Sequence, residues 1–516
     1  MLTQLFLLFV FPASAANVTL ASLFWGSSVV LQAGNSGARV WGSASPGASV
    51  RLTLDGAPVG TSVADASGRW ETLIPEQPPS WRVLTLRVAD DSSDSVASLR
   101  FGTVMLCSGQ SNMELPVGEL SNGTEEVAGA GAFNGRISLA TLQTPRGTTP
   151  SWNGSNVAPQ WNAVSPGHGG TLEGFSGLCW LSGRALFEAQ GGIAPVGLMV
   201  GAVGGTPIEA WLPVGVLGSQ CPADTPPCSG GADSSLYNSF IHPFAPTTLG
   251  AVLWDQGERD VRCFSPATNR TAQYPCMERS LVITWREAFK SPAAAFAAVQ
   301  LPGYLGDCSE HGGDYYNCVP GVFNMRLAQE EGLSGVANAS AVVTYDLSCP
   351  FGVKTPICPI GSVHNLNKTL VAARAARALL AQMAPAAFPP SGASPPRVAL
   401  VTASPTKAIS SGVARGGWTV TVTFDVSPLQ LRGTQYCEMC CAGGVGDFDA
   451  SVDGIQWVNS TGVQKPGSTD STVVFNVELK EKPSLVRYTA NQAFPQCAVV
   501  SIETGLPAAP FQVSVQ

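Results

Sequence analysis

Residues 104–113 read VMLCSGQSNM, and this stretch decides how the middle of the chain folds. It begins with a short apolar run and passes at once into small and polar residues. A buried strand of a parallel sheet reads as a continuous apolar run, and ligand sites form beyond the carboxyl ends of such strands. The stretch therefore predicts a buried strand that ends in an exposed polar loop holding Ser111.

Three later segments repeat this layout. Residues 194–200 (APVGLMV) lead into a glycine-rich loop, residues 251–254 (AVLW) lead into Gln256, and residues 341–344 (AVVT) lead into Asp346. Helix-like stretches lie between these runs, and residues 365–383 have the composition and spacing of a helix. The alternation predicts an α/β domain with a parallel sheet over residues 102–385, with the functional site at the carboxyl ends of its strands.

The flanking regions have the pattern of all-β domains. Short alternating runs separated by turn residues occupy residues 16–101, for example at 38–42, 49–54 and 82–88. Residues 386–397 are rich in proline and serine and are predicted to be a linker. Strand-like runs recur at 419–424 and 472–477. We expect an N-terminal β-sandwich over 16–101 and a C-terminal one over 398–516.

The first 15 residues are expected to be a secretory signal peptide. An apolar run at 5–11 precedes Pro12 and the small residues Ala13, Ser14 and Ala15, although the usual positive charge before the run is missing. A buried strand or a membrane anchor is the alternative, but the run is too short to span a bilayer. No later segment reaches 18 apolar residues, so no membrane span is expected. These features predict the secretory pathway, ending in secretion or in the lysosome.

Cysteine and asparagine patterns agree with that route. An even number of cysteines, 14, favours disulfides in an oxidising compartment. Four clusters suggest local loop staples, although the sequence leaves the connectivity open: Cys221/Cys228, Cys263/Cys276, Cys308/Cys318 and Cys349/Cys358. The C-x-x-C within 437–441 has no histidine near it, so disulfides are favoured there over zinc. Glycosylation sequons occur at Asn17, Asn122, Asn153, Asn269, Asn338, Asn367 and Asn459, with Asn367 the least expected because it adjoins His364.

Composition excludes some classes of function. Hydrophobic residues make up 45% and charged residues 12% of 516 residues, which supplies cores for two to four domains. The net charge of −8 argues against a nucleic-acid partner, which would need basic patches. The sequence predicts no metal and no cofactor, and it leaves the oligomeric state open.

Four polar loops are candidates for chemistry, and each also has a plain structural interpretation. Ser111 lies where a nucleophile would be exposed, or it caps the next helix. Gly204 and Gly205 allow close approach of backbone N–H groups to an oxyanion, or they form a tight turn. Gln256 offers a side-chain amide to the same oxyanion, or it begins a helix. His364 is one of four histidines and lies before a helix, where it is either the base that a serine esterase needs or a packed side chain.

Together these segments resemble the sialate O-acetylesterase family, a branch of the SGNH-type hydrolases. The similar blocks are GQSNM at 109–113, GGTPIEAW at 204–211, LYNSFIHP at 236–243, Trp254 with QGE at 256–258, and His364 with Lys368. Residues 29–32, 65–70 and 506–511 are similar to the family's flanking domains. The resemblance covers nearly the whole mature chain.

The resemblance implies a Ser-His esterase that works without metal. Ser111 would be the nucleophile and His364 its base. The Ser111 N–H, the Gly205 N–H and the Gln256 amide would hold the oxyanion, and Gly204 and Glu258 would complete the binding site. An acetyl-enzyme would form and be hydrolysed by water that His364 activates.

Departures from the family pattern leave the third catalytic member open. SGNH-type enzymes often have an acid two or three residues before the histidine, where this chain has Gly361 and Ser362. Asp346 is the first candidate for that role and Glu258 the second, and a Ser-His dyad is the alternative. Further departures lie at Asp255, at Arg259 and Asp260, and at 365–367, which reads NLN.

Three classes of function remain at this point. The first is an esterase that removes O-acetyl groups from sialic acid or a related sugar; a sialate carboxylate would favour a nearby cation, for which the candidates are Arg259, Arg262, Lys354 and Lys368. An acetylxylan-type esterase on a neutral polysaccharide belongs to the same class. The second is a catalytically silent, secreted glycan-binding protein. The third, a peptidase, is disfavoured because the G-x-S-x-G elbow is absent.

Overall fold

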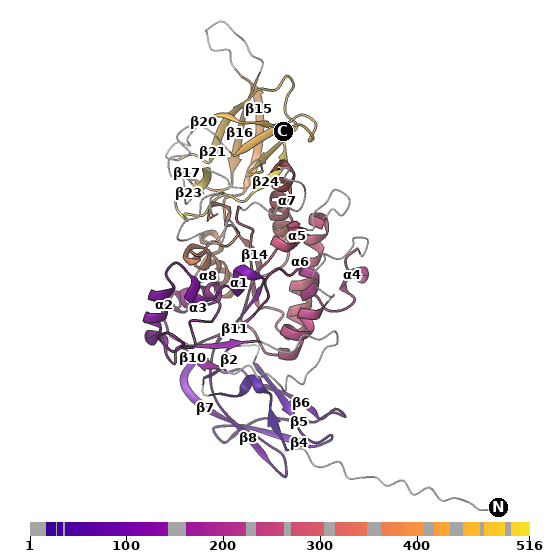
Figure 1. The fold of residues 1–516 in the computed structure, drawn as a ribbon, viewed down its shortest axis with the longest axis vertical. Helices are drawn as coiled ribbons and strands as arrows, with labels where there is room; N and C mark the ends of the chain where they lie inside the picture. The colour runs from indigo at the N-terminus through magenta and orange to yellow at the C-terminus, as the bar shows by residue number, and fades with distance from the viewer. Residues whose placement is uncertain are drawn as a thin grey trace, which may run out of the picture.

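The computed structural model describes residues 17–26, 28–34, 37–142, 161–222, 234–262, 270–303, 315–347, 363–406, 417–433, 447–464, 469–490 and 497–516. The predicted signal peptide lies outside these residues. Figure 1 shows an elongated molecule in which N-terminal strands occupy one end, a helix-covered sheet the middle, and C-terminal sheets the other end. Among the described residues, no helix is long and apolar enough to cross a membrane.

The middle of the molecule is built on a mostly parallel sheet. Its strands follow the order β10-β9-β11-β8-β12-β13-β14, and β10 is antiparallel to β9. Their bounds are β8 (Asp94–Gly109), β9 (Ile137–Thr141), β10 (Asn162–Ala163), β11 (Val196–Ala202), β12 (Ala251–Asp255), β13 (Ala295–Val299) and β14 (Ala339–Val342). The runs predicted at 104–106 and 251–254 therefore lie in strands β8 and β12, and the run predicted at 194–200 lies in β11 from Val196 onward. The run predicted at 341–344 lies only partly in β14, which ends at Val342. The α/β class is confirmed.

Helices cover both faces of this sheet. On one side lie α3 (Gly177–Ala189) and α8 (Thr369–Met383), and on the other α6 (Arg270–Ala288) and α7 (Tyr315–Leu333) (Figure 1). Successive side chains of a strand point to opposite faces. Met105 and Cys107 accordingly pack in the core under α3 and α8, whereas Val104 and Leu106 pack in the core shared with α6. Two-sided burial explains the continuous apolar run of β8.

Shorter helical segments lie in the connections. They are η1 (Ser22–Phe24), α1 (Ser111–Glu114), η2 (Val117–Glu119), α2 (Gly123–Gly129), η3 (Ala130–Phe133), η4 (Ile208–Trp211), α4 (Val216–Ser219), η5 (Tyr237–Ile241), η6 (His242–Phe244), α5 (Glu258–Arg262), η8 (Tyr345–Leu347) and η9 (Pro390–Gly392). Those that follow β8, β12 and β14, namely α1, α5 and η8, carry residues of the candidate site or contact them.

The N-terminal strands continue into the central sheet. β1 (Thr19–Leu20), β3 (Ala38–Ser43) and β6 (Arg69–Ile74) form a separate antiparallel sheet. β4 (Ser49–Leu54), β5 (Ala57–Val63) and β7 (Ser80–Ala89) join the central sheet through β7, which pairs with the first half of β8, and β2 (Val29–Gln32) also pairs with β8. The predicted boundary between residues 101 and 102 falls inside β8, whose 16 residues belong to both regions.

The described residues of the C-terminal region form three small antiparallel sheets. One has the order β15-β16-β21-β20, a second β19-β18-β22-β24, and a third pairs β17 with β23. The bounds are β15 (Val398–Pro405), β16 (Trp418–Phe424), β17 (Leu429–Gly433), β18 (Phe448–Ser451), β19 (Val458–Asn459), β20 (Thr461–Gln464), β21 (Thr472–Val477), β22 (Leu485–Tyr488), β23 (Cys497–Ser501) and β24 (Phe511–Ser514). β16 and β21 contain the two predicted strands.

Among the described residues, disulfides join Cys107 to Cys179 and Cys221 to Cys276. The expectation of local staples within Cys221/Cys228 and within Cys263/Cys276 is therefore wrong. Folding places the segment after α4 against α6, so Cys221 meets a partner 55 residues away rather than its sequence neighbour. The other predicted pairs lie outside the described side chains, and no group of metal-ligating residues is found among those described.

Candidate active site

The candidate site lies where the connections of the central sheet change direction. After β8 the chain passes to β9 and β11 on one side, and only then to β12 on the other. Open α/β sheets bind ligands at such a switch point, beyond the carboxyl ends of the strands. The loops that follow β8, β11 and β12 hold Ser111, Gly204 and Gln256 respectively, so three of the four predicted blocks meet at this point.

Ser111 and His364 form the centre of the site. The Nε2 atom of His364 lies 2.8 Å from the Oγ of Ser111, although 253 residues separate them in the sequence. Both side chains are partly exposed. A hydroxyl within hydrogen-bond reach of an imidazole is the arrangement that a serine nucleophile and its base require.

The turn that presents Ser111 depends on Gly109. Its φ is +143°, and a Cβ at this position would lie 2.0 Å from the backbone oxygen of Asp255 on β12. The next residue, Gln110, donates its N–H to that same oxygen at 3.0 Å. β8 and β12 therefore approach so closely that only glycine fits, and the chain turns from strand to helix within two residues.

Asn112, next to the nucleophile, connects three segments. Its Nδ2 donates to Glu258 Oε1 at 2.6 Å and to the carbonyl of Val363 at 3.1 Å. Its Oδ1 accepts a hydrogen bond from Lys368 Nζ at 2.6 Å. Because Val363 immediately precedes His364, this one side chain holds the nucleophile loop, α5 and the histidine loop together. The prediction from sequence missed this role, although the asparagine stands in the matched block.

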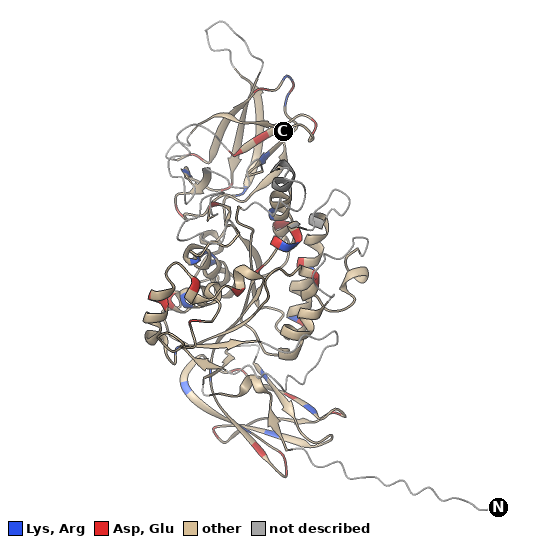
Figure 2. Cartoon of the chain, in the orientation of Figure 1, with Lys and Arg blue, Asp and Glu red and all other residues tan. Residues whose placement is uncertain are grey.

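Asn112 contacts two members of a group of buried charges, Glu258 and Lys368, and Asp255 interacts electrostatically with both. Asp255, Glu258 and Lys368 are each no more than 5% exposed. Burial, together with repulsion by Glu258, raises the pKa of Asp255 to about 7, and Lys368 partly opposes this. Burial lowers the pKa of Lys368, while Asp255 and Glu258 favour its charged form. Figure 2 shows charges of both signs concentrated at α5, which contributes Glu258.

The first of the paired glycines, Gly204, approaches the nucleophile closely. A Cβ on Gly204 would lie 3.3 Å from the Cβ of Ser111 and 3.0 Å from Glu114 Oε2. The Gly204 N–H donates to that carboxylate at 2.7 Å, and Gly205 has a positive φ of +70°. The exposed carboxylate of Glu114 therefore stands beside Ser111, a position that no sequence signal indicated.

Gln256 lies in the loop after β12, and its side-chain amide donates to Thr206 and Asp260. Its Nε2 donates to the Thr206 carbonyl at 3.0 Å and to Asp260 Oδ2 at 2.6 Å, and its Oε1 accepts from the Tyr274 hydroxyl at 2.9 Å. A primary amide has two N–H hydrogens, and these contacts occupy both. Burial raises the pKa of Asp260 to about 7. In this structure Gln256 braces the second loop against α5, and its oxyanion role stays a prediction.

The structure does not bring Asp346 to His364. Its two carboxylate oxygens accept hydrogen bonds from Arg374 at 2.6 and 2.7 Å, and Arg432 contacts one of them at 3.3 Å. A carboxylate held in this way by a bidentate arginine is an ion pair between elements. Glu258, the other acidic candidate, contacts Asn112.

The candidate cations for an anionic sugar are placed in different ways. Lys368 is buried and bound to Asn112, so it offers no surface charge. The backbone N–H of Arg259 donates to Gln110 Oε1 at 3.3 Å, and its side chain is partly buried. Lys354 and the side chain of Arg262 lie outside the described part of the chain.

Comparisons with known proteins agree with this geometry. Residues 102–334 match the family model described as carbohydrate esterase, sialic acid-specific acetylesterase. The chain is 29% identical over 381 residues to a human protein named sialate O-acetylesterase, a match that covers 67% of this chain and 68% of the relative. A rat protein of the same name is 28% identical over 402 residues, covering 67% and 70%.

Among solved structures, a carbohydrate acetylesterase from Xanthomonas citri aligns with a TM-score of 0.72 at 23% identity. The alignment covers 96% of this chain and 99% of that one, so the two share an overall fold. The family match ends at residue 334, before His364. The placement of His364 therefore rests on its contact with Ser111.

Proposed function

We propose that the chain hydrolyses O-acetyl esters of sugars with Ser111 as nucleophile and His364 as base, because residues 102–334 match the family model of sialic acid-specific acetylesterases among the carbohydrate esterases. The observation that carries this proposal is the 2.8 Å contact between Ser111 Oγ and His364 Nε2 at the switch point of the sheet. An intact pair of this kind disfavours the silent glycan-binding alternative.

The reaction proceeds in two steps. Ser111 Oγ attacks the acetyl carbonyl carbon while His364 Nε2 takes the hydroxyl proton, and a tetrahedral oxyanion forms. The intermediate collapses, the C–O bond to the sugar breaks, and His364 returns the proton to the departing sugar oxygen. Water, deprotonated by His364, then attacks the acetyl-enzyme, releases acetate and restores the Ser111 hydroxyl.

The oxyanion is held by the backbone N–H groups of Ser111 and Gly205, with Gln256 as a third donor. Gly204, which directly precedes Gly205, lies close to Ser111, and this supports the proposal. Gln256 joins them only by exchanging one of its present contacts, with Thr206 or Asp260, for the oxyanion. Removal of one oxyanion donor typically raises the barrier by roughly 3 to 4 kcal/mol.

We propose an O-acetylated sialic acid or a related sugar as the substrate. The human and rat relatives are named for sialate, which supports the anionic sugar. A second candidate, an acetylated neutral polysaccharide such as xylan, is favoured by the exposed Glu114 carboxylate beside Ser111, because a like charge repels an anionic substrate.

We further propose that the central region is an SGNH-like hydrolase domain flanked by β-sandwiches, and that the protein enters the secretory pathway after cleavage near residue 15. The whole-chain likeness to the Xanthomonas structure supports the first point. The two disulfides support the second, because such bonds persist in oxidising compartments.

The test is acetate release from a 9-O-acetylated sialoside and from acetylated xylan. Wild type is compared with Ser111→Ala and His364→Ala, and His168→Ala serves as the control because His168 is an exposed imidazole bonded to Glu173. We expect release that both site variants abolish and the control retains. Release from xylan alone would favour the neutral sugar as the substrate. If neither substrate releases acetate in a way that depends on Ser111, the proposal is contradicted.

A further inference from the structure

The three-residue helix η8, Tyr345–Leu347, lies between the core of the C-terminal domain and the core of the hydrolase domain. Tyr345 and the nearby Val343 are buried among C-terminal residues such as Phe475, whereas Leu347 packs in the core under α3 and α8. The Tyr345 hydroxyl lies 3.0 Å from that of Tyr488 on β22. One short segment therefore belongs to two domains at once.

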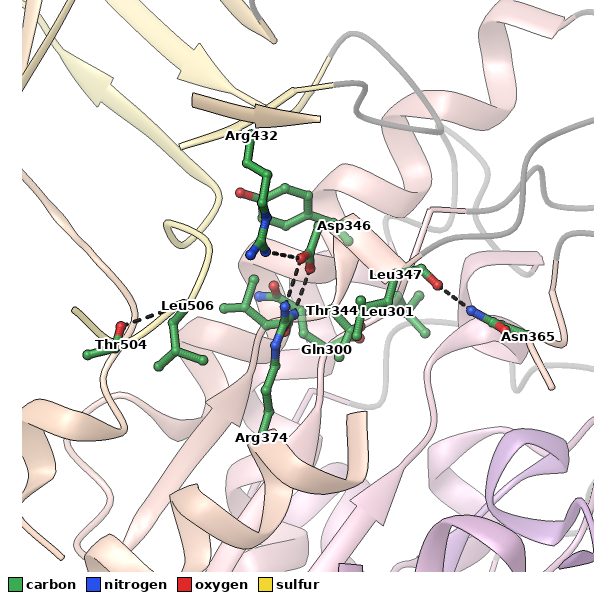
Figure 3. A network of polar contacts seen from close by, with 12 residues as sticks. Gln300, Leu301, Thr344, Asp346, Leu347, Asn365, Arg374, Arg432, Thr504 and Leu506 are labelled. Atoms are coloured by element: carbon green, nitrogen blue, oxygen red, sulfur yellow. Dashed lines mark hydrogen bonds and ion pairs between the residues drawn. The ribbon is translucent and has the colours of Figure 1, made fainter. Parts of the chain in front are cut away.

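Asp346, at the centre of η8, is held from both domains. Arg374 of α8 binds both carboxylate oxygens, and Arg432 of β17 approaches from the C-terminal domain at 3.3 Å (Figure 3). The Asp346 side chain is 3% exposed, that of Arg374 7% and that of Arg432 43%. Arg374 also donates to the carbonyl of Val343 at 2.8 Å, which fixes the strand end that leads into η8.

The last residue of η8 contacts the histidine loop. The Leu347 carbonyl accepts a hydrogen bond from Asn365 Nδ2 at 2.7 Å (Figure 3). The Asn365 side chain is buried, and its Oδ1 accepts the N–H of Asn367 at 2.8 Å. Asn365 directly follows His364, whose imidazole contacts Ser111. A continuous series of contacts thus runs from Arg432 through η8 and Asn365 to the base.

We infer that the C-terminal domain is part of the catalytic apparatus, because η8, held by Arg432 and Tyr488, positions His364 through the bond from Asn365 to the Leu347 carbonyl. Asp346 and Asn365 are positioning residues in this scheme, and neither contacts the reacting atoms. The inference rests on the proposed function and adds a role for residues 398–516. Small displacements of a catalytic group lower the rate steeply, so such a brace affects turnover more than binding.

Arg377 provides a matched control. It lies on the same helix α8 as Arg374, and both of its terminal nitrogens donate to the carbonyl of Thr504 at 3.0 Å. This contact also crosses to the C-terminal domain, but it does not involve η8. If the interface only attaches the C-terminal domain to the hydrolase domain, loss of Arg377 and loss of Arg432 should have similar effects on kcat.

The experiment uses the full chain and 4-nitrophenyl acetate, with kcat and KM measured separately. We expect Asn365→Ala to lower kcat about 10- to 100-fold and Arg432→Ala to lower it about 3- to 10-fold, each with little change in KM. Arg432→Lys should recover part of the loss, and Arg377→Ala should keep wild-type kcat. In the Asn365→Ala background, Arg432→Ala should have no further effect, because both act through one series of contacts. Asp346 is left intact, because its removal would leave the guanidinium of Arg374 buried without its carboxylate partner.

A second readout does not depend on turnover. The chain has only four histidines, so selective labelling gives few imidazole resonances in an NMR spectrum, and His364→Ala assigns the one of interest. We expect Arg432→Ala and Asn365→Ala to shift that resonance and Arg377→Ala to leave it in place. Equal effects of Arg432→Ala and Arg377→Ala, or additive effects in the double variant, would overturn the inference. Failure of the proposed function would give a different result: the Ser111→Ala variant would hydrolyse the ester as fast as wild type.

Discussion

Asn112 shows how much of the site depends on a residue that performs no chemistry. Its carboxamide contacts Glu258, Lys368 and the carbonyl before His364, and all three contacts lie within 3.1 Å. Removing one member of a buried network leaves its partners desolvated and unpaired, which costs more than the bond itself contributes. The bond from Asn112 to the Val363 carbonyl therefore joins the loops of Ser111 and His364 and maintains the spacing between the two residues.

We predict that Asn112→Ala lowers kcat/KM about 100-fold and destabilises the fold by roughly 2 to 4 kcal/mol. Esterase kinetics and urea unfolding measure the two effects. Gln382→Ala is the matched control, because this amide makes three comparable contacts, to Phe296 and Ser340, away from the site. It should lose stability and keep its kinetics. Equal kinetic losses in both variants would contradict a specific role for Asn112.

Asp255 makes the stability of the site depend on pH. Its pKa is about 7 in the folded chain against an ordinary value of 3.8, so the folded state holds the proton more tightly. The stabilising effect is complete below about pH 4 and is lost as the pH rises through about 7. Asp260 shares this behaviour.

Asp255→Asn is accordingly expected to flatten the dependence of unfolding free energy on pH between about 4 and 7. Near pH 4 the variant should resemble wild type, and at pH 8 it should be more stable by on the order of 4 kcal/mol. Urea unfolding at four pH values measures the difference. Asp260→Asn tests whether Asp260 causes the pH dependence of unfolding free energy that remains in the Asp255→Asn variant. An unchanged pH profile in Asp255→Asn would show that the Asp255 carboxyl does not titrate in this range.

Among the elements, β8 and its turn matter most for the site. The sequence predicted this strand and the position of Ser111 because a two-sided apolar run and a polar end are local patterns. His364 was predicted from its block, and the structure places it at Ser111. The bonds of Gln256 to Thr206 and Asp260, and of Asp346 to Arg374, could not be predicted, because both join elements whose packing no local pattern specifies.

Gly109→Ala should disrupt the turn that begins α1. The methyl group would have to displace the β12 backbone at Asp255, and the positive φ adds strain, so we expect a loss of at least about 3 kcal/mol and of activity. Gly129→Ala in helix α2 is the control, since nothing lies within 4 Å of its added Cβ. That variant should be neutral or slightly stabilising. Thermal unfolding compares the two, and similar melting temperatures would count against the predicted clash.

At the scale of the whole molecule, β8 makes the N-terminal strands and the catalytic sheet one structure. Residues 99–102 pair with β2, while residues 103–109 pair with β11. The composition of residues 16–101 predicted separate strands, but it gave no sign that the last of them continues into the next domain. Strand propensity depends on local sequence, whereas the extension of β8 through two regions depends on the strands with which each of its halves pairs.

Leu99→Ala, in the first half of β8, should therefore weaken the distant active site. Leu99 is 1% exposed, and its truncation is expected to cost about 2 to 5 kcal/mol. Thermal loss of esterase activity and loss of far-UV circular dichroism should shift to lower temperature together. Val96→Ala, on the same strand but 57% exposed, should shift neither. Unchanged inactivation in the Leu99 variant would show that the two regions melt independently.

The continuous strand also restricts how the molecule can move. A hinge needs a few residues whose dihedral angles change freely, and the junction after residue 101 offers none, because its backbone is hydrogen-bonded into ladders along both halves of β8. The N-terminal domain cannot rock away from the catalytic sheet to admit a bulky glycan. Changes in the loops around Ser111 can therefore alter the accepted size of substrate while the N-terminal strands and the catalytic sheet stay joined.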